Sequence, residues 1–287
     1  MFETAFLKGS LQNGLTGKKR FLMVNLKSDD DIKWMRHSGT ITAAVLQELA
    51  KNCQEGICVN DLDRMAESMI KKMGAVPAFK NYNGYPKTIT VSINEQVVHG
   101  IPGKRKIKKG DLVSFDMGAF YKGHCSDSAL SVLVGDNPDP EDLKLLNTTK
   151  EALYKGIAQF VEGNRLGDIS HAVQEYAEGR GFSVVRDLVG HGIGRAMHED
   201  PSVPNFGKAG RGMALKKGLV LAIEPMINAG VYDVIFLDDG WTVITADGKK
   251  SAHFEHTVAL TDRGPRILTL PEDASEEEEY PLLALQK

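Results

Sequence analysis

The chain has 287 residues, of which 42% are hydrophobic and 25% charged, and its formal net charge is -3. These proportions are typical of a globular protein and exclude disordered and fibrous compositions. The length allows one large domain or two small ones with a substantial buried core. Because the chain lacks the basic field that attracts polyanions, a small-molecule or peptide substrate is favoured over nucleic acid.

The cysteines and the N-terminus indicate the compartment. Cys53, Cys58 and Cys125 are an odd, sparse set without the spacing of a zinc ribbon or a disulfide framework, and we interpret them as reduced thiols. The sequence has no apolar run of about 18 residues and no apolar core of a secretory signal. The basic cluster at 18–20 could belong to an organellar presequence, but Glu3 and the scarcity of arginine argue against it. The prediction is a cytoplasmic enzyme without membrane association.

The first elements expected along the chain are two helices. Residues 1–27 show no helical period and are expected to form an N-terminal extension. A helix then begins after Ser28, a suitable N-cap that precedes three aspartates at the positive end of the helix dipole. A second helix is expected at about 61–73, capped by Asn60 and closed by Gly74.

Strands and helices then alternate once more. Runs rich in β-branched and aromatic residues predict strands at 88–94 and 111–123, and helices are expected at 139–161 and 167–179. Further short apolar runs predict strands at 182–189, 218–228, 241–246 and 251–260. Helices followed by strands, twice over, indicate an α+β fold with two similar halves.

The domain organisation follows from the same pattern. Residues 28–270 are expected to form the catalytic domain behind the extension at 1–27. The acidic residues in 271–287 are expected to form a solvated, mobile tail without a catalytic role.

Four carboxylates occupy unusual positions for charged residues. Asp116 and Asp127 flank a predicted hairpin, so pairing of its strands would bring them together. Glu224 follows five apolar residues in LVLAIEPMIN, and Glu255 stands mid-strand in HFEHTVAL. Acidic residues are rarely buried without a counter-charge. Taken singly, the two aspartates could instead stabilise turns, whereas Glu224 alone already favours a ligand.

Three histidines lie in glycine-containing or strand-end segments. His191 stands in VGHGIG, where small neighbours let a metal ion or a substrate approach the imidazole. His198 in MHEDP is far enough along the chain to return to the same cavity, and His99 in VVHGIP precedes a turn. Each histidine on its own is more typical of a surface loop than of a site.

Five of these residues, Asp116, Asp127, His191, Glu224 and Glu255, can be interpreted as the ligands of two divalent cations. Two such cations neutralise four carboxylates, the imidazole adds a softer donor, and a bridging hydroxide would complete the site. Without cations, four buried carboxylates would repel one another and take up protons. Cobalt, manganese, iron and zinc all accept these ligands, so the sequence leaves the metal open.

Eight sequence motifs resemble, in order and spacing, those of the methionine aminopeptidases. The resemblance spans about residues 28–270 and includes all five candidate ligands and two accessory histidines. The short interval between Glu224 and Glu255 is similar to that of the type I, bacterial-like members. The motifs are NGYPKTITVSINEQVVHGIP, FDMG, SD at 126–127, GHGIG, MHEDP, IEPMIN, DGWTV and FEHTVALT.

The resemblance implies a pita-bread fold, in which two pseudo-symmetric halves surround a central curved antiparallel sheet. It also implies that Asp127 and Glu255 bridge two metal ions. Asp116 would complete the coordination of one ion, and His191 with Glu224 would complete the coordination of the other. In the family a metal-bridging hydroxide attacks the first peptide bond of the substrate.

The resemblance further assigns the catalytic residues and the substrate pocket. Glu224 would carry a proton to the leaving amine, His198 would polarise the carbonyl and stabilise the oxyanion, and His99 would hydrogen-bond the substrate backbone. The free α-amine would bind towards the metal ions. The positions that match the pocket are Phe79, Tyr82, Tyr85, Thr90, His99, Met197, His198 and Trp241.

Four positions depart from the pattern of the bacterial enzymes. Phe79 and Thr90 stand where small thiol residues are usual, and Met197 stands where an aromatic is usual. Phe79 is expected to narrow the methionine pocket and Met197 to return some room, unless the changes only repack the cluster. Ser126 replaces a glycine and is expected to alter the local backbone, with more effect on turnover than on metal binding.

The expected activity is removal of the initiator methionine from peptides and nascent chains with a small second residue. One alternative is a hydrolase of Xaa-Pro bonds, which normally has an additional domain that residues 1–27 are too short to form. Another is a catalytically weak or silent pita-bread binding protein, which should have lost ligands. We expect a monomer, with the ribosome as a further partner suggested by nascent-chain substrates.

Overall fold

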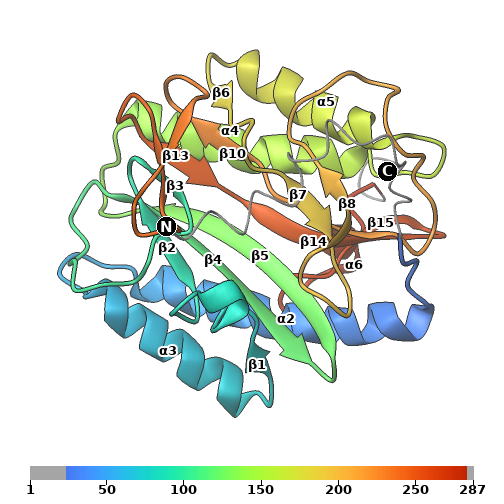
Figure 1. Cartoon of the computed structure of the whole chain (residues 1–287), viewed down its shortest axis with the longest axis horizontal. Helices are drawn as coiled ribbons and strands as arrows, with labels where there is room; N and C mark the ends of the chain where they lie inside the picture. The colour runs from blue at the N-terminus through green and yellow to red at the C-terminus, as the bar shows by residue number, and fades with distance from the viewer. Residues whose placement is uncertain (1–23, 283–287) are drawn as a thin grey trace.

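A computed structural model of the chain describes residues 24–282. Two helix pairs and a short C-terminal helix surround the sheets (Figure 1). The helical segments are α2 (Asp29–Asn52), α3 (Val59–Lys72), the 3-10 turn η1 (Tyr82–Gly84), α4 (Pro140–Ala158), α5 (Leu166–Glu178) and α6 (Glu276–Glu279). Within residues 24–282, no helix combines the length and apolarity that crossing a membrane would need.

The main sheet has nine strands, and every pair in it is antiparallel. Its strands are β1 (Val76–Pro77), β2 (Thr90–Ile93), β4 (Leu112–Tyr121), β5 (His124–Leu133), β7 (Gly190–Gly192), β8 (Glu199–Val203), β9 (Val220–Ile223), β14 (Glu255–Thr261) and β15 (Gly264–Ile267). Their order is β1-β4-β5-β14-β9-β7-β8, with β2 paired to β4 and β15 to β14.

Two small sheets complete the fold. One has the order β13-β10-β6 and the other β11-β12-β3. Their strands are β3 (Gln96–Val98), β6 (Ser183–Val184), β10 (Met226–Asn228), β11 (Val234–Phe236), β12 (Val243–Thr245) and β13 (Ser251–His253). In Figure 1, α2 and α3 lie along the side of the β4–β5 hairpin, α4 lies near β10 and β13, and α5 lies against α4 and β6. One helix pair therefore packs in each half, as the alternating pattern predicts.

The start of α2 is the predicted cap. The Ser28 hydroxyl accepts a hydrogen bond from the Asp31 amide at 3.2 Å, and the Asp31 carboxylate accepts one from the Ser28 amide at 3.2 Å. This reciprocal arrangement satisfies amides that the first turn of a helix leaves unpaired. Beyond the cap, Val45 and Leu49 are fully buried in a core cluster with Phe115 of β4. The cap and the apolar stripe together fix α2 on the hairpin.

Several predicted elements differ from the structure. α3 begins at Val59, with Cys58 rather than Asn60 at the N-cap position, although Gly74 follows the helix in the expected left-handed conformation. The predicted strand at 218–228 is divided into β9 and β10, because Pro225 has no amide to continue the ladder. The strand predicted at 251–260 is also divided. It forms β13 and β14, which belong to different sheets.

Part of the acidic C-terminal run contacts the rest of the domain. α6 lies within this run, and the Glu279 carboxylate pairs with Arg36 of α2 and Arg266 of β15, each at 2.8 Å. The Glu279 side chain is only 16% exposed. Two arginines from distant parts of the chain thus supply a counter-charge that the local sequence does not reveal. Residues 1–23 of the expected N-terminal extension, including the basic cluster at 18–20, lie outside the described residues.

Replacing Ser28 by alanine should lower the free energy of unfolding by about 1 kcal/mol, because the exposed side chain contributes mainly its capping bond. Urea unfolding followed by circular dichroism measures the change. Ser28→Asn, which keeps an acceptor at the cap, should retain most of that stability. Equal losses in both variants would contradict the capping role.

Candidate active site

Three of the predicted ligands share one face of the central strands. Ala129 of β5 lies opposite Asp116 of β4 and opposite Glu255 of β14. Directly opposed residues in antiparallel strands point to the same face, and so do residues two apart on one strand. Asp127 is two residues from Ala129, so its carboxylate joins the other two. The predicted hairpin is confirmed, with its turn at Lys122 and Gly123.

Strand register also brings the remaining two candidate ligands, His191 and Glu224, to this face. His191 of β7 lies opposite Ala222 of β9, which in turn lies opposite Thr257 of β14. Thr257 is two residues from Glu255, and Glu224 follows Ala222 by two residues. His191 therefore lies on a strand and not in the expected loop. All five candidate ligands face the same side of the sheet.

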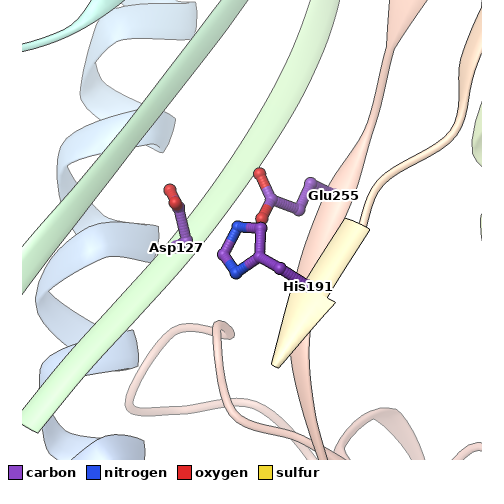
Figure 2. Close-up of side chains that lie close together, drawn as sticks. All are labelled: Asp127, His191 and Glu255. Atoms are coloured by element: carbon purple, nitrogen blue, oxygen red, sulfur yellow. The ribbon is translucent and has the colours of Figure 1, made fainter. Parts of the chain in front are cut away.

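The side-chain atoms are close as well as co-facial. One potential ligand atom each from Asp127, His191 and Glu255 lies within 4.8 Å of the other two (Figure 2). These side chains come from β5, β7 and β14 respectively. The Glu224 Oε1 atom lies 3.5 Å from His191 Nε2, and the carboxyl groups of Asp116 and Asp127 hydrogen-bond to each other. The structure thus brings together every ligand that the sequence predicted.

Small residues on the same face leave room for this cluster. Ala129 and Ala222 occupy the positions between ligands, and Gly118 lies opposite Asp127. A Cβ atom at Gly118 would lie 2.8 Å from the Ser126 carbonyl oxygen and 3.3 Å from Asp127 Oδ1. None of these three small residues was among the positions predicted for the site. Glycine or alanine two positions from an isolated acidic residue on a strand is the signal that could have found them.

Burial and mutual repulsion shift the protonation of the carboxyl groups. Burial raises the pKa of Asp116 to about 8. Burial raises the pKa of Asp127, Glu224 and Glu255 well above the usual range, and the charges of neighbouring carboxylates raise it further. Without cations, burial and mutual repulsion thus favour the protonated forms of these groups.

The donor atoms fit divalent cations. Among the described residues, the buried oxygens without a hydrogen-bond partner include Asp116 Oδ1, Asp127 Oδ1 and Glu255 Oε1. An unpaired buried acceptor costs about 1–3 kcal/mol, which coordination to a cation would offset. The His191 Nδ1 atom donates to the Gly192 carbonyl at 2.9 Å, so Nε2 keeps the lone pair that a metal ligand needs.

The two accessory histidines border this cluster. The ring of His198 lies 4.1 Å from that of His191 and stacks on Tyr82 at 5.3 Å, measured between centroids. A 3.0 Å hydrogen bond joins His198 Nδ1 to the Tyr82 hydroxyl. His99 interacts electrostatically with His198, and burial lowers the pKa of His99 to about 4. His99 is therefore neutral at pH 7.

An apolar cluster contains most of the predicted pocket residues. Tyr85 lies at its centre, with edge contacts to Trp241 at 5.0 Å and Phe79 at 6.5 Å between ring centroids. Thr90 on β2 lies opposite Asp116, so it stands on the sheet next to the carboxylates. The pocket residues within the cluster are Phe79, Tyr82, Tyr85, Met197 and Trp241.

Ser126 does not distort the backbone as expected. It lies in regular β5, opposite Ala119, and strand alternation directs it away from the face that carries Asp127. Its hydroxyl lies 2.9 Å from Ser38 Oγ and 2.8 Å from Thr42 Oγ1 of α2. The extra hydroxyl is thus satisfied in a buried contact between β5 and α2.

Comparison with known proteins agrees with this geometry. Residues 33–262 match metallopeptidase family M24. The chain belongs to this family. A methionine aminopeptidase from Clostridium acetobutylicum is 50% identical over 251 residues, which cover 87% of this chain and 100% of that protein. The crystal structure of methionine aminopeptidase from Thermotoga maritima has a TM-score of 0.85 and 44% identity, covering 86% of this M24 chain and 100% of its own.

A more distant member of the fold is prolidase from Pyrococcus furiosus, at 22% identity and a TM-score of 0.69. The matched region covers 86% of this M24 chain but only 66% of the prolidase chain. At this identity, the similarity shows a shared fold alone. The comparisons confirm the predicted pita-bread fold, the metallopeptidase class and the resemblance to methionine aminopeptidases.

The metal-free protein should lose stability as the pH rises from about 7 to 8. A carboxyl group whose pKa is higher in the folded state stabilises the fold at low pH, and that stability is lost as the pH approaches the folded pKa, about 8 for Asp116. Burial lowers the pKa of His191 to about 4, so its titration adds nothing in this window. Urea unfolding in chelator measures the slope.

Adding manganese should abolish this loss, and Glu255→Gln should reduce it in the metal-free protein by removing one of the repelling groups. A stability that is constant or rises between these pH values in chelator would contradict the assigned electrostatics.

Proposed function

We propose that this M24 metallopeptidase removes the N-terminal methionine from peptides and nascent chains whose second residue is small. The observation that carries the proposal is the convergence of Asp116, Asp127, His191, Glu224 and Glu255 on one sheet face. Its relatives named methionine aminopeptidase support the substrate class.

Two divalent cations of cobalt, manganese, iron or zinc are proposed as cofactors. Bound to these five ligands, they would supply an activated water as nucleophile and polarise the scissile carbonyl. By resemblance to the family, Asp127 and Glu255 are proposed as the ligands shared by both ions; like Asp116, each has a buried oxygen without a hydrogen-bond partner. Asp116 would complete the coordination of one ion, and His191 with Glu224 would complete the coordination of the other.

Glu224 is proposed as the proton carrier. Its carboxylate lies beside the His191 imidazole at 3.5 Å, and burial raises its pKa well above the usual range. A carboxyl group in this environment can accept a proton at Oε1 from the nucleophile and deliver it to the leaving amine.

His198 and His99 are proposed to bind the peptide group. We assign the Tyr82 hydroxyl as the donor in its 3.0 Å bond with His198 Nδ1, so that Nε2 is the nitrogen that carries the proton. That N–H can donate to the scissile carbonyl oxygen and stabilise the charge that develops on it. His99, neutral because of its burial, can hydrogen-bond the substrate backbone next to the scissile amide.

The apolar cluster is proposed as the methionine pocket. Phe79, Tyr85 and Met197 are all at most 8% exposed, and Tyr82 and Trp241 pack against them. The free α-amine of the substrate would bind towards the metal ligands, so only the first residue of a chain can fill the pocket. Thr90, His99 and His198 would line the polar side.

The proposal extends to the rest of the chain and to its setting. We propose residues 28–270 as the catalytic domain, with 1–27 and 271–287 as flanking segments; the family match at 33–262 lies inside it. Cytoplasmic action is supported by three free cysteines, since thiols stay reduced there. A monomer that meets its nascent substrates near the ribosome is part of the same proposal.

Metal-stripped protein reconstituted with a single metal should release methionine from Met-Ala-Ser and no leucine at a comparable rate from Leu-Ala-Ser. Asp116→Asn should fold but lose more activity than the roughly 10- to 100-fold typical of outer-shell changes, because it removes a direct ligand. Amino-acid release measured by chromatography gives both rates. No methionine release with any of the four metals would disprove the proposed activity.

Phe79→Ala should widen the pocket and lower the ratio of kcat/KM for Met-Ala-Ser over Leu-Ala-Ser by about tenfold, the discrimination that a few methylene-sized contacts provide. Phe182→Ala is the matched control, because Phe182 is 7% exposed, against 8% for Phe79, and belongs to a separate core cluster. It should destabilise the fold without changing the ratio. An unchanged ratio in Phe79→Ala would remove Phe79 from the pocket.

A further inference from the structure

The segment between β7 and β8 carries two residues of the proposed site, Met197 and His198. It turns tightly, since the Gly194 amide donates to the Ala196 carbonyl at 3.0 Å. The Cys125 amide of β5 donates to the Gly194 carbonyl at 2.8 Å. These backbone bonds anchor the beginning of the loop, residues 193–198. At its end, the Met197 carbonyl bonds to the His191 ring and the His198 ring bonds to the Tyr82 hydroxyl.

Glu199, the first residue of β8, closes the other end of the loop. Its Oε1 atom accepts a hydrogen bond from the Ala196 amide at 3.1 Å, and its Oε2 atom pairs with Lys27 Nζ at 2.7 Å. Lys27 is fixed in turn, because its backbone amide donates to the Gly218 carbonyl at 2.7 Å. The carboxylate therefore connects the loop to the segment that precedes α2.

The loop is shaped around this ion pair. A Cβ atom at Gly194 would lie 2.4 Å from Lys27 Cε and 2.7 Å from Glu199 Oε1. Any side chain at this position would displace the lysine or the glutamate. The glycine thus provides the space through which the lysine side chain reaches the carboxylate.

Burial distinguishes the Lys27–Glu199 pair from the other ion pair on the loop. The side chains of Lys27 and Glu199 are only 6% and 9% exposed. A buried pair contributes little net stability, since desolvation offsets much of the attraction and apolar replacements are often neutral. Arg195, by contrast, pairs with Asp31 at 2.8 Å while 68% exposed, which makes that contact weak.

We propose that Lys27 and Glu199 are positioning residues whose ion pair holds loop 193–198 in place. The pair fixes His198 beside His191 and Met197 in the wall of the pocket. The inference rests on the proposed function for its kinetic test, and its structural test is independent of turnover. A residue from the N-terminal end of the domain thereby orders catalytic groups of the C-terminal half.

The kinetic test uses the double variant Lys27→Met/Glu199→Gln. Both charges are removed, so no buried charge is left unpaired, and glutamine keeps an acceptor for the Ala196 amide. With Met-Ala-Ser, kcat should fall about 10- to 100-fold, the loss that a displacement of about 1 Å causes, while KM changes little. Arg195→Met, the matched control on the same loop, should leave kcat within about twofold.

The structural test uses metal-free protein with ¹³C-labelled histidine rings. The His198 signal, assigned by its absence in His198→Gln, should be single and sharp in the wild type and in Arg195→Met. It should shift or broaden in the double variant, while circular dichroism reports the same folded fraction.

Three results would overturn the proposal: wild-type kcat in the double variant, an unchanged His198 signal, or a loss of kcat that only follows a fall in the folded fraction. A wild-type protein that releases no methionine would instead disprove the proposed function, and the histidine signal would still decide the positioning role.

Discussion

Four carboxyl groups share one buried face of the main sheet, and the cost of keeping them together is the constraint on which the rest of the structure depends. The strands that carry them are tied by more than their ladder. The Thr257 hydroxyl accepts from the Asp127 amide and donates to the Asp127 carbonyl, at 2.9 and 2.7 Å, and the Ser128 hydroxyl donates to the Glu255 carbonyl at 2.6 Å. These bonds hold β5 against β14 at the positions that carry Asp127 and Glu255.

Because side chains alternate along a strand, the two faces of β5 contact different parts of the structure. Asp127 faces the carboxylate cluster, whereas Ser126 faces α2 and bonds to the hydroxyls of Ser38 and Thr42. The helix is in turn fixed at its start by the cap at Ser28. The helix thus contacts β5, the strand that carries Asp127, through buried hydroxyl groups.

Both halves of the fold contribute to one site. β4 and β5 supply two aspartates, whereas β7, β14 and the residue after β9 supply the histidine and the glutamates. The Lys27–Glu199 pair crosses the same boundary and joins the start of the domain to the loop that bears His198. Because each half carries only part of the donor set, neither could neutralise or use the cluster alone.

The sequence by itself determined the α+β pattern, the Ser28 cap, the hairpin and the five candidate ligands, because these depend on periodicity, turn chemistry and isolated charges on apolar strands. Only the tertiary structure decided that β9 and β10, and likewise β13 and β14, belong to different sheets. It also decided the pairing of Glu279 with two arginines, the hydroxyl contacts of Ser126 and the Lys27–Glu199 pair. Such contacts join residues far apart in the chain, and their energy depends on distances and burial that no local pattern encodes.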